Sequence, residues 1–338
     1  MPGPSSSIKI NIFLFILCCL TFIFLEKLIA LSIKLFRHLF IRFFLPMKKI
    51  SLCLSTKIFS FSYFFTVDKI SRVVGGIDDK SGDIAQLFYS QFITTGVTKL
   101  SSIEAAEATK LLENIFRDVN IALVNELAQI FPKFGLDVFE IINAAKTKPF
   151  AFMPHYPGAG VGGECIPVDT WYLISQARDL GIDTKLMKIA RTVNDSMPEH
   201  VISLLEEEFK KIGKDLGQST VTVLGLCYKK NIPDIRLSPT FPLLEKLTSK
   251  NVNTIVCDPL YENINKSPVN LTSIDESFKN SDAILLITDH DEFSKIDFEK
   301  IKNEMKTKII IDGRNFFKNK NLENLGFSYR AIGKPQIN

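Results

Sequence analysis

The sequence predicts an α/β protein in which a helical central domain is followed by a doubly wound parallel α/β domain, with an apolar segment in front. Three observations in the 338 residues support this prediction. Between residues 102 and 212, apolar residues recur at helical spacing. After Gly213, short runs rich in Val, Ile and Leu alternate with helical stretches, which is typical of a parallel sheet. Before residue 68, the composition fits neither pattern.

Residues 1–67 form the apolar, basic segment. Eight Lys and Arg residues against one Glu give this segment a charge of +7, whereas the remainder carries 33 basic and 36 acidic residues, a charge of −3. The segment holds 12 of the 28 Phe residues but, in Gly3, a single one of the 17 glycines. Because a parallel α/β unit needs glycine-bearing turns, we do not expect such a unit here.

Two interpretations of this segment remain open. Residues 10–25 carry no charge and are followed by Lys and Arg, so residues 10–45 are where membrane contact is expected, with the body of the protein on the cytoplasmic side. The uncharged run is shorter than the roughly 20 residues that span a bilayer. The alternative is a shifted reading frame or a mispredicted start in AT-rich DNA, and the composition favours this alternative.

Residues 68–212 are predicted to form the helical central domain. Residues 70–82 indicate a strand, a turn and the start of a helix. A long helix is expected over 102–134, because Ser102 can cap it and two acids follow in its first turns. Gly135 ends it, a second helix is expected over 136–146, and further helices over 169–181 and 183–212, after a loop at 149–163.

Residues 213–338 are predicted to form the C-terminal α/β domain. The expected strands are residues 221–226, 253–257, 283–288 and 308–311. The expected helices are residues 240–249, 274–279 and 297–305. Strict alternation of the two predicts a Rossmann-like parallel sheet covered by helices.

The loop at residues 157–169 is the most informative stretch for chemistry. Four of the six residues from Gly158 to Gly163 are glycines, which bring backbone N–H groups close to a ligand. Cys165 follows at the start of a helix, where its thiolate is favoured, and Asp169 one turn later can orient water or a proton. The alternative is a glycine-rich hairpin with a structural cysteine. The other five cysteines have no metal-ligand spacing, so no metal site is predicted.

Two groups of polar side chains are further candidates. Lys110, Asn114 and Arg117 lie at i, i+4 and i+7 and share one helix face, where they either bind a polar ligand or form a solvated stripe. Three cations, Lys229, Arg236 and Arg314, follow predicted strands. Because the carboxyl ends of parallel strands meet at one edge, these cations indicate a phosphate or pyrophosphate ligand rather than isolated surface charges.

Together these stretches resemble the UDP-glucose/GDP-mannose dehydrogenase family, which oxidises nucleotide sugars at C6. The likeness covers residues 70–330 and rests on four motifs in family order. They are Glu107-Ala-Thr-Lys110-Leu-Leu-Glu-Asn114, Gly162-Gly163-Glu164-Cys165, Tyr228-Lys229 with Asp234-Ile-Arg236, and Asp312-Gly-Arg314. Residues 147–157 are similar to the N-acetylglucosamine type of the family rather than the N-acetylmannosamine type.

The resemblance implies an enzyme that oxidises the C6 hydroxyl of a UDP-sugar, UDP-N-acetylglucosamine above all, to the uronic acid in polysaccharide precursor synthesis. The cofactor would be NAD. Cys165 would attack the aldehyde, and a thiohemiacetal would become a thioester that water cleaves. Lys110 and Asn114 would serve proton transfer and oxyanion stabilisation, and Asp169 the hydrolysis. The residues expected to hold the UDP-sugar are Arg117, Gly162, Tyr228, Lys229 and Arg314; Arg236 would reach NAD.

Three departures from the family pattern stand out. Glu164 occupies a position where this branch has histidine, and a carboxylate there should raise the pKa of the Cys165 thiol. Thr170 replaces a proline. The family's N-terminal NAD-binding domain has no counterpart before residue 70. The alternative function is therefore a catalytically inactive, dimeric UDP-sugar-binding remnant.

The expected partners follow from the same comparison. The long helix at 102–134 resembles the dimer core of the family, so a homodimer is expected. We expect a cytoplasmic location for the body of the protein. Nucleic-acid binding is not expected, because the basic excess lies in an apolar segment and the body is mildly acidic.

Overall fold

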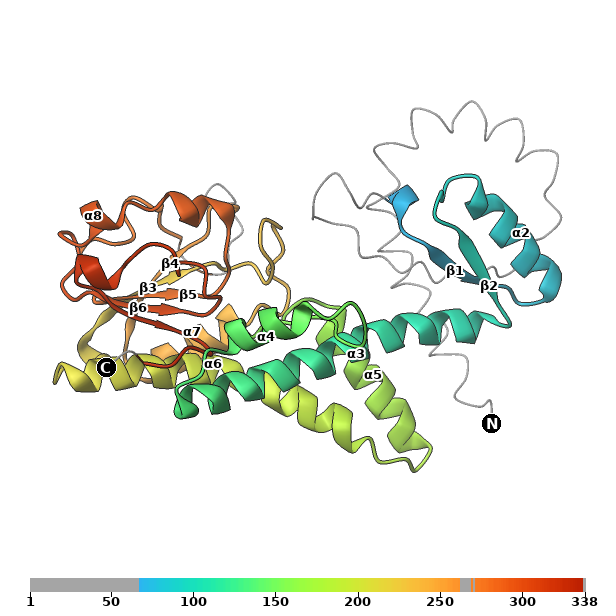
Figure 1. Ribbon diagram of the computed structural model, residues 1–338, viewed down its shortest axis with the longest axis horizontal. Coiled ribbons are helices and arrows are strands. Elements are labelled where there is room, and N and C mark those ends of the chain that lie inside the picture. Colours follow the sequence, from blue (N-terminus) through green and yellow to red (C-terminus); the bar gives the residue numbers. More distant parts are fainter. Residues whose placement is uncertain (1–66, 262–268, 270, 337–338) are drawn as a thin grey trace.

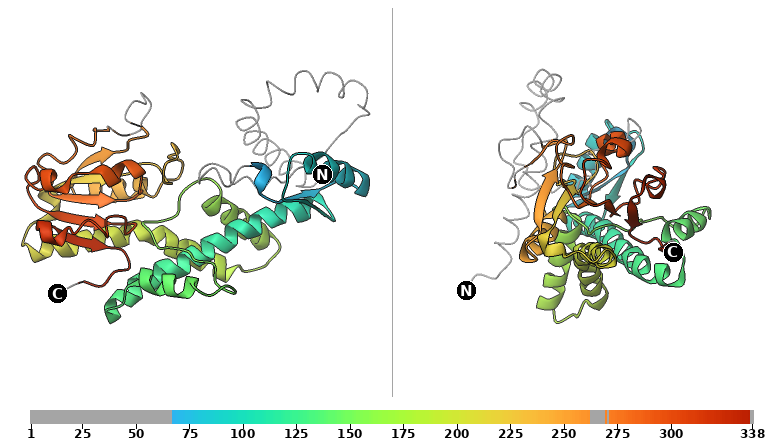
Figure 2. Two further views of the ribbon diagram at one scale, coloured as in Figure 1. Left: turned by 45° about the horizontal axis from the view of Figure 1, so that its top comes forward. Right: turned by 90° about the vertical axis from the view of Figure 1, so that its left-hand side faces the viewer.

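The computed structural model describes residues 67–261, 269 and 271–336. Along the chain it consists of a small βαβ unit, a set of long helices and a five-stranded α/β domain (Figure 1). Turned views show the βαβ unit and the sheet domain at opposite ends of the long helices (Figure 2). The predicted fold class is confirmed. The candidate membrane segment at residues 10–25 lies outside the described residues, and no described helix is long and apolar enough to span a bilayer.

The βαβ unit confirms the strand, turn and helix start predicted at 70–82. After a 3-10 turn η1 (Val67–Lys69), strand β1 (Arg72–Gly75) leads to helix α2 (Asp79–Ser90), which is capped by Asp78 and Ser81 in a reciprocal capping box. Strand β2 (Val97–Leu100) then pairs in parallel with β1. Strand β2 was not predicted, because its four residues carry no apolar period of their own and become a strand by pairing.

Helix α3 (Ile103–Ile130) is the longest element of the described chain. The Ser102 hydroxyl accepts a hydrogen bond from the Ala105 N–H and caps it, as predicted. A 3-10 turn, η2 (Phe131–Phe134), extends α3 to Gly135, whose φ of 75° ends the helical path, and helix α4 (Val138–Lys146) follows. The predicted helices at 102–134 and 136–146 are therefore confirmed.

Two further helices complete the central domain. Helix α5 (Ile166–Asp179) begins three residues before the predicted start, with Pro167 in the first turn, where a missing N–H costs no hydrogen bond. Helix α6 (Lys185–Lys211) runs from the central domain to the underside of the C-terminal sheet (Figure 1). One helix therefore packs in both domains.

The C-terminal domain is a five-stranded parallel sheet with the order β4-β3-β5-β6-β7. Its strands are β3 (Thr220–Leu224), β4 (Asn253–Cys257), β5 (Ala283–Leu286), β6 (Ile309–Asp312) and β7 (Ser328–Ala331). Because the chain leaves β3 first toward β4 and then crosses to β5, the switch point of this doubly wound sheet lies at the carboxyl ends of β3 and β5. Ligands bind such sheets at that point.

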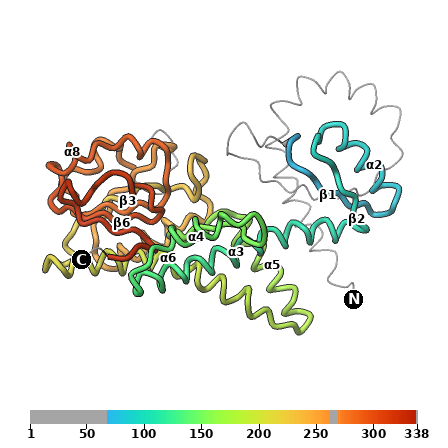
Figure 3. The backbone as a smooth tube through the Cα atoms, in the orientation of Figure 1, coloured from blue at the N-terminus to red at the C-terminus, as the bar shows by residue number. Residues whose placement is uncertain are grey.

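Alternate residues of the strands pack on the two faces of the sheet. Val221 and Val223 of β3 join the core beneath α6 and α7 (Thr240–Ser249), while Leu224 joins a second core rich in phenylalanine. Helix α8 (Phe298–Ile301) contributes Phe298 and Ile301 to the second core. Figure 3 shows α8 and α6 on opposite sides of the sheet. Three 3-10 turns complete the connections, η3 (Leu216–Gln218), η4 (Asp291–Lys295) and η5 (Glu323–Leu325).

The predicted bounds of α7 and β4 are confirmed to the residue. Two predictions were wrong: residues 274–279 form turns rather than a helix, and the helix expected over 297–305 is reduced to the single turn of α8. Strand β7 was not predicted. Its four residues, Ser328–Ala331, form a strand because they pair with β6, and no local sequence pattern predicts this pairing.

A buried ion pair joins α3 to α6. The Arg191 guanidinium donates to Asp118 Oδ1 at 2.7 Å, and the side chains are 2% and 0% exposed. Asn194 also donates to the Asp118 carboxylate, at 2.8 Å. Since a buried charge is costly without its partner, this pair determines how the two helices pack.

We expect Asp118→Ala to lower the free energy of unfolding by about 3 kcal/mol. The variant removes the buried carboxylate that pairs with Arg191, and the buried guanidinium then keeps only the partly exposed carboxylate of Asp195 as a partner. Urea denaturation followed by circular dichroism measures the change. Glu199→Gln, which removes an exposed ion pair with Lys246, is the control and should cost less than about 1 kcal/mol. Equal losses in both variants would contradict the role of the buried pair.

Candidate active site

Hydrogen bonds from two buried asparagines, Asn125 of α3 and Asn194 of α6, hold the start of the glycine-rich loop in place. The Gly158 N–H donates to Asn125 Oδ1 at 2.9 Å, and the Asn125 amide donates to Asn194 Oδ1 at 2.9 Å. Asn194 is the residue that also donates to Asp118. The polar contacts between α3 and α6 therefore continue into the loop and fix its start.

The glycines let this loop approach the C-terminal domain at backbone distance. A Cβ on Gly162 would lie 2.6 Å from both Tyr228 Cβ and the Leu237 carbonyl oxygen, so no side chain fits there. The Gly163 N–H donates to the Arg236 carbonyl at 3.0 Å, with a φ of 89° that favours glycine. Gly158 is similarly close to the Arg314 guanidinium. The sequence-predicted loop and strand ends are thus brought together.

Cys165 lies at the N-terminus of α5, half-buried and not in a disulfide. One turn along α5, Asp169 accepts a short hydrogen bond from the Asn114 amide. Asn114 Oδ1 in turn accepts from Lys110 Nζ at 3.0 Å. The predicted group Lys110, Asn114 and Asp169 is therefore one hydrogen-bonded chain beside the cysteine, and the alternative of a solvated stripe is excluded for the fully buried Asn114.

Burial dominates the electrostatics of Cys165. Loss of solvent raises the pKa of its thiol, and the neighbouring carboxylates of Asp169 and Glu164 raise it further. Lys110 and Arg236 act in the opposite direction but do not prevail. The helix N-terminus was expected to favour the thiolate of Cys165, but burial acts against the thiolate, while the predicted direction of the Glu164 effect is confirmed.

Asp169 is also poised to hold a proton. Burial raises the pKa of its carboxyl, although the Asn114 hydrogen bond and Lys110 oppose the shift. A carboxyl group with a raised pKa close to a thiol can accept and return a proton. The geometry therefore places a nucleophile, a proton acceptor and a cationic hydrogen-bond donor within one small region.

Two half-buried cations, Arg117 and Lys229, are close enough to influence each other, and Arg117 also interacts with Cys165. Burial lowers the pKa of the Arg117 guanidinium, and the pKa of Lys229 is lowered by burial and then by the charge of Arg117. A phosphate group bound between Arg117 and Lys229 would raise the pKa of both side chains again, because its negative charge stabilises their charged forms. Lys229 follows β3 at the switch point of the sheet, which is the predicted position for a phosphate ligand.

Arg314 and Tyr228 complete the set of predicted binding residues. The Arg314 guanidinium donates to the Ile287 carbonyl at 3.0 Å and its backbone N–H to Asp312 at 2.9 Å, so the side chain is anchored at the carboxyl end of β6. Tyr228 lies against Gly162 and Gly163, and burial raises the pKa of its hydroxyl. Arg236 forms ion pairs with two carboxylates, those of Asp234 and Glu164.

Two structural groups were missed at the level of sequence. Asp118 and Asn125 lie four and eleven residues after Asn114 on the same face of α3, a spacing that could have revealed them. The second group is Cys227, Asp258 and His290, buried at the ends of β3, β4 and β5. These residues are far apart in sequence, and no local pattern connects them.

The Cys227, Asp258 and His290 group has metal-ligand residue types but not metal-ligand chemistry. The Asn231 N–H donates to His290 Nδ1 at 2.9 Å, so the ring proton is on Nε2, which faces Asp258 Oδ2 at 3.2 Å. If Nε2 bound a metal, the ring proton would have to be on Nδ1, where it would face the Asn231 N–H, and two donors cannot hydrogen-bond to each other. Asp258 also accepts from the Leu226 and Cys227 N–H groups. The group therefore holds the segment after β3 in place.

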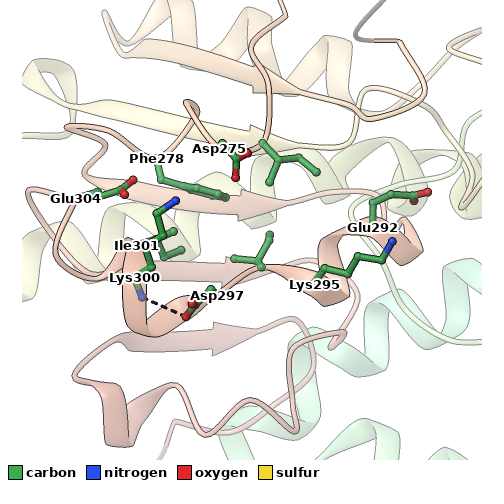
Figure 4. Close-up of a pocket in the computed structure, with 10 residues that line it drawn as sticks. Asp275, Phe278, Glu292, Lys295, Asp297, Lys300, Ile301 and Glu304 are labelled. Carbon is green, nitrogen blue, oxygen red and sulfur yellow. Dashed lines mark hydrogen bonds between the residues drawn. The ribbon is translucent and has the colours of Figure 1, made fainter.

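A cavity of about 320 Å³ lies elsewhere in the C-terminal domain (Figure 4). Charged side chains surround an apolar floor: it is lined by Ile274, Asp275, Phe278, Glu292, Lys295, Ile296, Asp297, Lys300, Ile301 and Glu304. None of the predicted site residues lines it. This cavity is therefore separate from the candidate active site.

Two models of one family match the chain. The central domain of the UDP-glucose/GDP-mannose dehydrogenase family matches residues 104–196, and its UDP binding domain matches residues 222–319. The matched ranges contain Lys110, Cys165 and the cations after β3 and β6. The loop and the strand ends described above thus lie within the family's own domains.

Known relatives are similar over the same region. A UDP-N-acetyl-D-mannosamine dehydrogenase of Pyrococcus horikoshii is 37% identical over 79% of this chain and 60% of its own length, and one of Methanocaldococcus jannaschii is 38% identical over 78% and 59%. The solved structure of the Pyrococcus horikoshii enzyme has a TM-score of 0.71 at 36% identity, covering 80% of this chain and 61% of that one. That of an NDP-N-acetyl-D-galactosaminuronic acid dehydrogenase of Methanosarcina mazei has a TM-score of 0.72 at 31% identity, covering 79% and 59%.

The chain therefore spans about three fifths of the length of the relatives it matches. Their names specify N-acetylmannosamine or N-acetylgalactosaminuronic acid, so the expected N-acetylglucosamine specificity is not confirmed.

We expect alkylation of Cys165 by iodoacetamide to accelerate about tenfold per pH unit between pH 7 and 8.5, because the thiol pKa lies above its ordinary value and only the thiolate reacts. Mass spectrometry of the tryptic peptide 147–178, in which Cys165 is the sole cysteine, measures the rate. The fully buried Cys227 should stay unmodified in the same digest. A plateau reached by pH 8 would contradict the raised pKa.

Proposed function

The chain belongs to the UDP-glucose/GDP-mannose dehydrogenase family, and on this basis we propose that it serves the NAD-dependent, four-electron oxidation of a UDP-sugar at C6 to the uronic acid. The observation that carries the proposal is the juxtaposition of Cys165 with the Lys110, Asn114 and Asp169 chain. A nucleophilic thiol, a proton acceptor and an oxyanion donor are what this chemistry requires.

The described residues do not form a cradle for NAD. Arg236, the side chain expected to reach the cofactor, donates to Asp234 and Glu164. The glycines after β1 are used for packing, since a Cβ on Gly76 would lie 2.2 Å from the Gly82 nitrogen. NAD is therefore proposed from the family alone, as the acceptor of the two hydrides.

Cys165 would perform the covalent steps. Its sulfur adds to the C6 aldehyde and gives a thiohemiacetal; loss of a hydride and a proton gives a thioester, which water cleaves to release the acid and the thiol. The thiol must lose its proton to attack, and Asp169 is the neighbouring group with a raised pKa that can take it. The Lys110 ammonium, held by Asn114, would stabilise the oxyanion at C6.

The UDP end of the substrate would lie along the strand ends of the C-terminal domain. Arg117 and Lys229 offer two adjacent cations for the diphosphate, and Arg314 a third, anchored one. Gly162 and Tyr228 pack against each other too closely for a Cβ on the glycine, and would contact the substrate beside Cys165. This arrangement would hold the sugar C6 toward the thiol.

The sugar is proposed to be an N-acetylhexosamine. The loop at 147–157 favours the gluco epimer from its sequence, whereas the names of the relatives at 37–38% identity favour the manno epimer. Both epimers carry the same UDP group and differ only at C2 of the sugar, where the acetamido group is equatorial in the gluco epimer and axial in the manno epimer. Direct comparison of the two substrates decides between them.

The test is NADH formation, followed by absorbance, with UDP-N-acetylglucosamine and UDP-N-acetylmannosamine. We expect Cys165→Ser to abolish acid formation while UDP binding by calorimetry is retained, because the UDP contacts lie on other residues. Cys257→Ala, which removes a buried thiol outside the site, is the matched control and should remain active. Full activity of Cys165→Ser would overturn the assignment, and UDP binding by the parent chain without NADH release would favour the binding-only alternative.

We further propose that α3 forms the centre of a homodimer. Leu112, Phe116, Leu123 and Ile130 are exposed apolar residues on one face of this helix. Leu123→Glu should reduce the mass in solution from dimer to monomer at micromolar concentration, because a carboxylate would be buried in an apolar interface. Light scattering after gel filtration measures this mass. Ile212→Glu at the far end of α6 is the control, and a dimeric Leu123→Glu would refute the assignment.

A further inference from the structure

Arg236 is held between two carboxylates at the edge of the candidate active site. Its Nε donates to both oxygens of Asp234, at 2.9 and 3.1 Å, and one terminal nitrogen donates to Asp234 Oδ2 at 2.6 Å. The other terminal nitrogen donates to Glu164 Oε2. Each guanidinium nitrogen is therefore engaged by a carboxylate.

The contact with Glu164, here called the Glu164–Arg236 bridge, joins two segments that are 72 residues apart. The backbone N–H of the preceding Gly163 donates to the Arg236 carbonyl at 3.0 Å, so the two segments are linked by both backbone and side chains. The bridge closes the gap between the cysteine loop and the segment after β3. Breaking the side-chain bridge leaves the backbone link in place.

The two carboxylates hold Arg236 to different degrees. The Asp234 side chain is 16% exposed and accepts several hydrogen bonds from Arg236, including one from the Arg236 backbone N–H at 3.0 Å. Glu164 is 38% exposed and makes a single contact. An anion that approaches Arg236 from solvent would therefore displace Glu164 and leave Asp234 in place.

Both members of the bridge act on Cys165. The Glu164 carboxylate raises the pKa of the thiol and the Arg236 charge lowers it, so moving the Glu164 carboxylate away from Cys165 would favour the thiolate. The other charged or titratable groups facing the thiol are Lys110 and Arg117 from α3, Asp169 from α5, and Tyr228 after β3. None of these belongs to the bridge.

We propose that the Glu164–Arg236 bridge couples anion binding to the reactivity of Cys165. A phosphate or pyrophosphate group that binds Arg236 replaces the Glu164 carboxylate, which then turns to solvent, away from the thiol. In the unliganded protein the bridge keeps Arg236 occupied and the cysteine less reactive. The proposal rests on the proposed role of Cys165 as nucleophile. Physically, the Glu164 carboxylate and the phosphate compete for the guanidinium of Arg236.

The first test removes the carboxylate without changing the size of the side chain. Glu164→Gln should make Cys165 three- to tenfold more reactive toward iodoacetamide at pH 7.5, measured on the tryptic peptide 147–178. The gain stays within one order of magnitude because both members of the bridge are partly exposed and screened by solvent. Glu199→Gln, which breaks the exposed pair with Lys246, should leave the rate unchanged.

The second test measures the binding of inorganic pyrophosphate by calorimetry. Glu164→Gln should bind it three- to tenfold more tightly than the parent chain, and the gain should vanish in an Arg236→Gln background. An unchanged alkylation rate or an unchanged affinity in Glu164→Gln would overturn the proposal. A gain that persists without Arg236 would overturn it as well, because Glu164 would then act by general repulsion.

Neither measurement depends on turnover. A chain that forms no NADH but shows both effects would refute the proposed dehydrogenase activity and leave the coupling intact. A chain that forms NADH but shows neither effect would do the reverse.

Discussion

The rest of the structure depends on the hydrogen bonds that the buried Asp118 carboxylate accepts from helix α6. This carboxylate accepts hydrogen bonds from Arg191 and Asn194 of α6, and Asn194 continues through Asn125 to the backbone of Gly158. In a low-dielectric interior, moving either helix would break these hydrogen bonds and separate a buried charge from its partner, so the contacts favour one arrangement of α3 and α6. Because α6 also covers the C-terminal sheet, the same helix sets the position of the loop and of the strand ends.

The consequence for the site is a close meeting of two domains. The glycine-rich loop carries Cys165 and approaches the segment after β3 so closely that Gly162 has no space for a Cβ. The candidate nucleophile therefore comes from the central domain, while the cations proposed to bind a diphosphate come from both domains. Neither domain contains the candidate site alone, and the buried polar chain keeps its two halves together.

Burial is the largest influence on the pKa of four groups in this site. It raises the pKa of Cys165 and Asp169, and it lowers the pKa of Arg117 and Lys229. Cys165 and Asp169 are thus shifted toward holding protons, and Arg117 and Lys229 toward losing them, whereas the paired Asp234 and Arg236 are shifted in the opposite directions. An anionic ligand would reverse the balance at Arg117 and Lys229.

The sequence by itself determined the fold class and the local constellations. Helix α7 and strand β4 follow from apolar period and length, and Lys110, Asn114 and Arg117 share a face because helical spacing is a local property. Strands β2 and β7 escaped prediction, since four-residue segments become strands only by pairing with a neighbour. The pairing of Glu164 with Arg236, the network around Asp118 and the neutralising effect of burial on Cys165 join residues tens of positions apart or depend on excluded solvent. Only the tertiary structure decided these, because distance through space and loss of water are created when the chain packs.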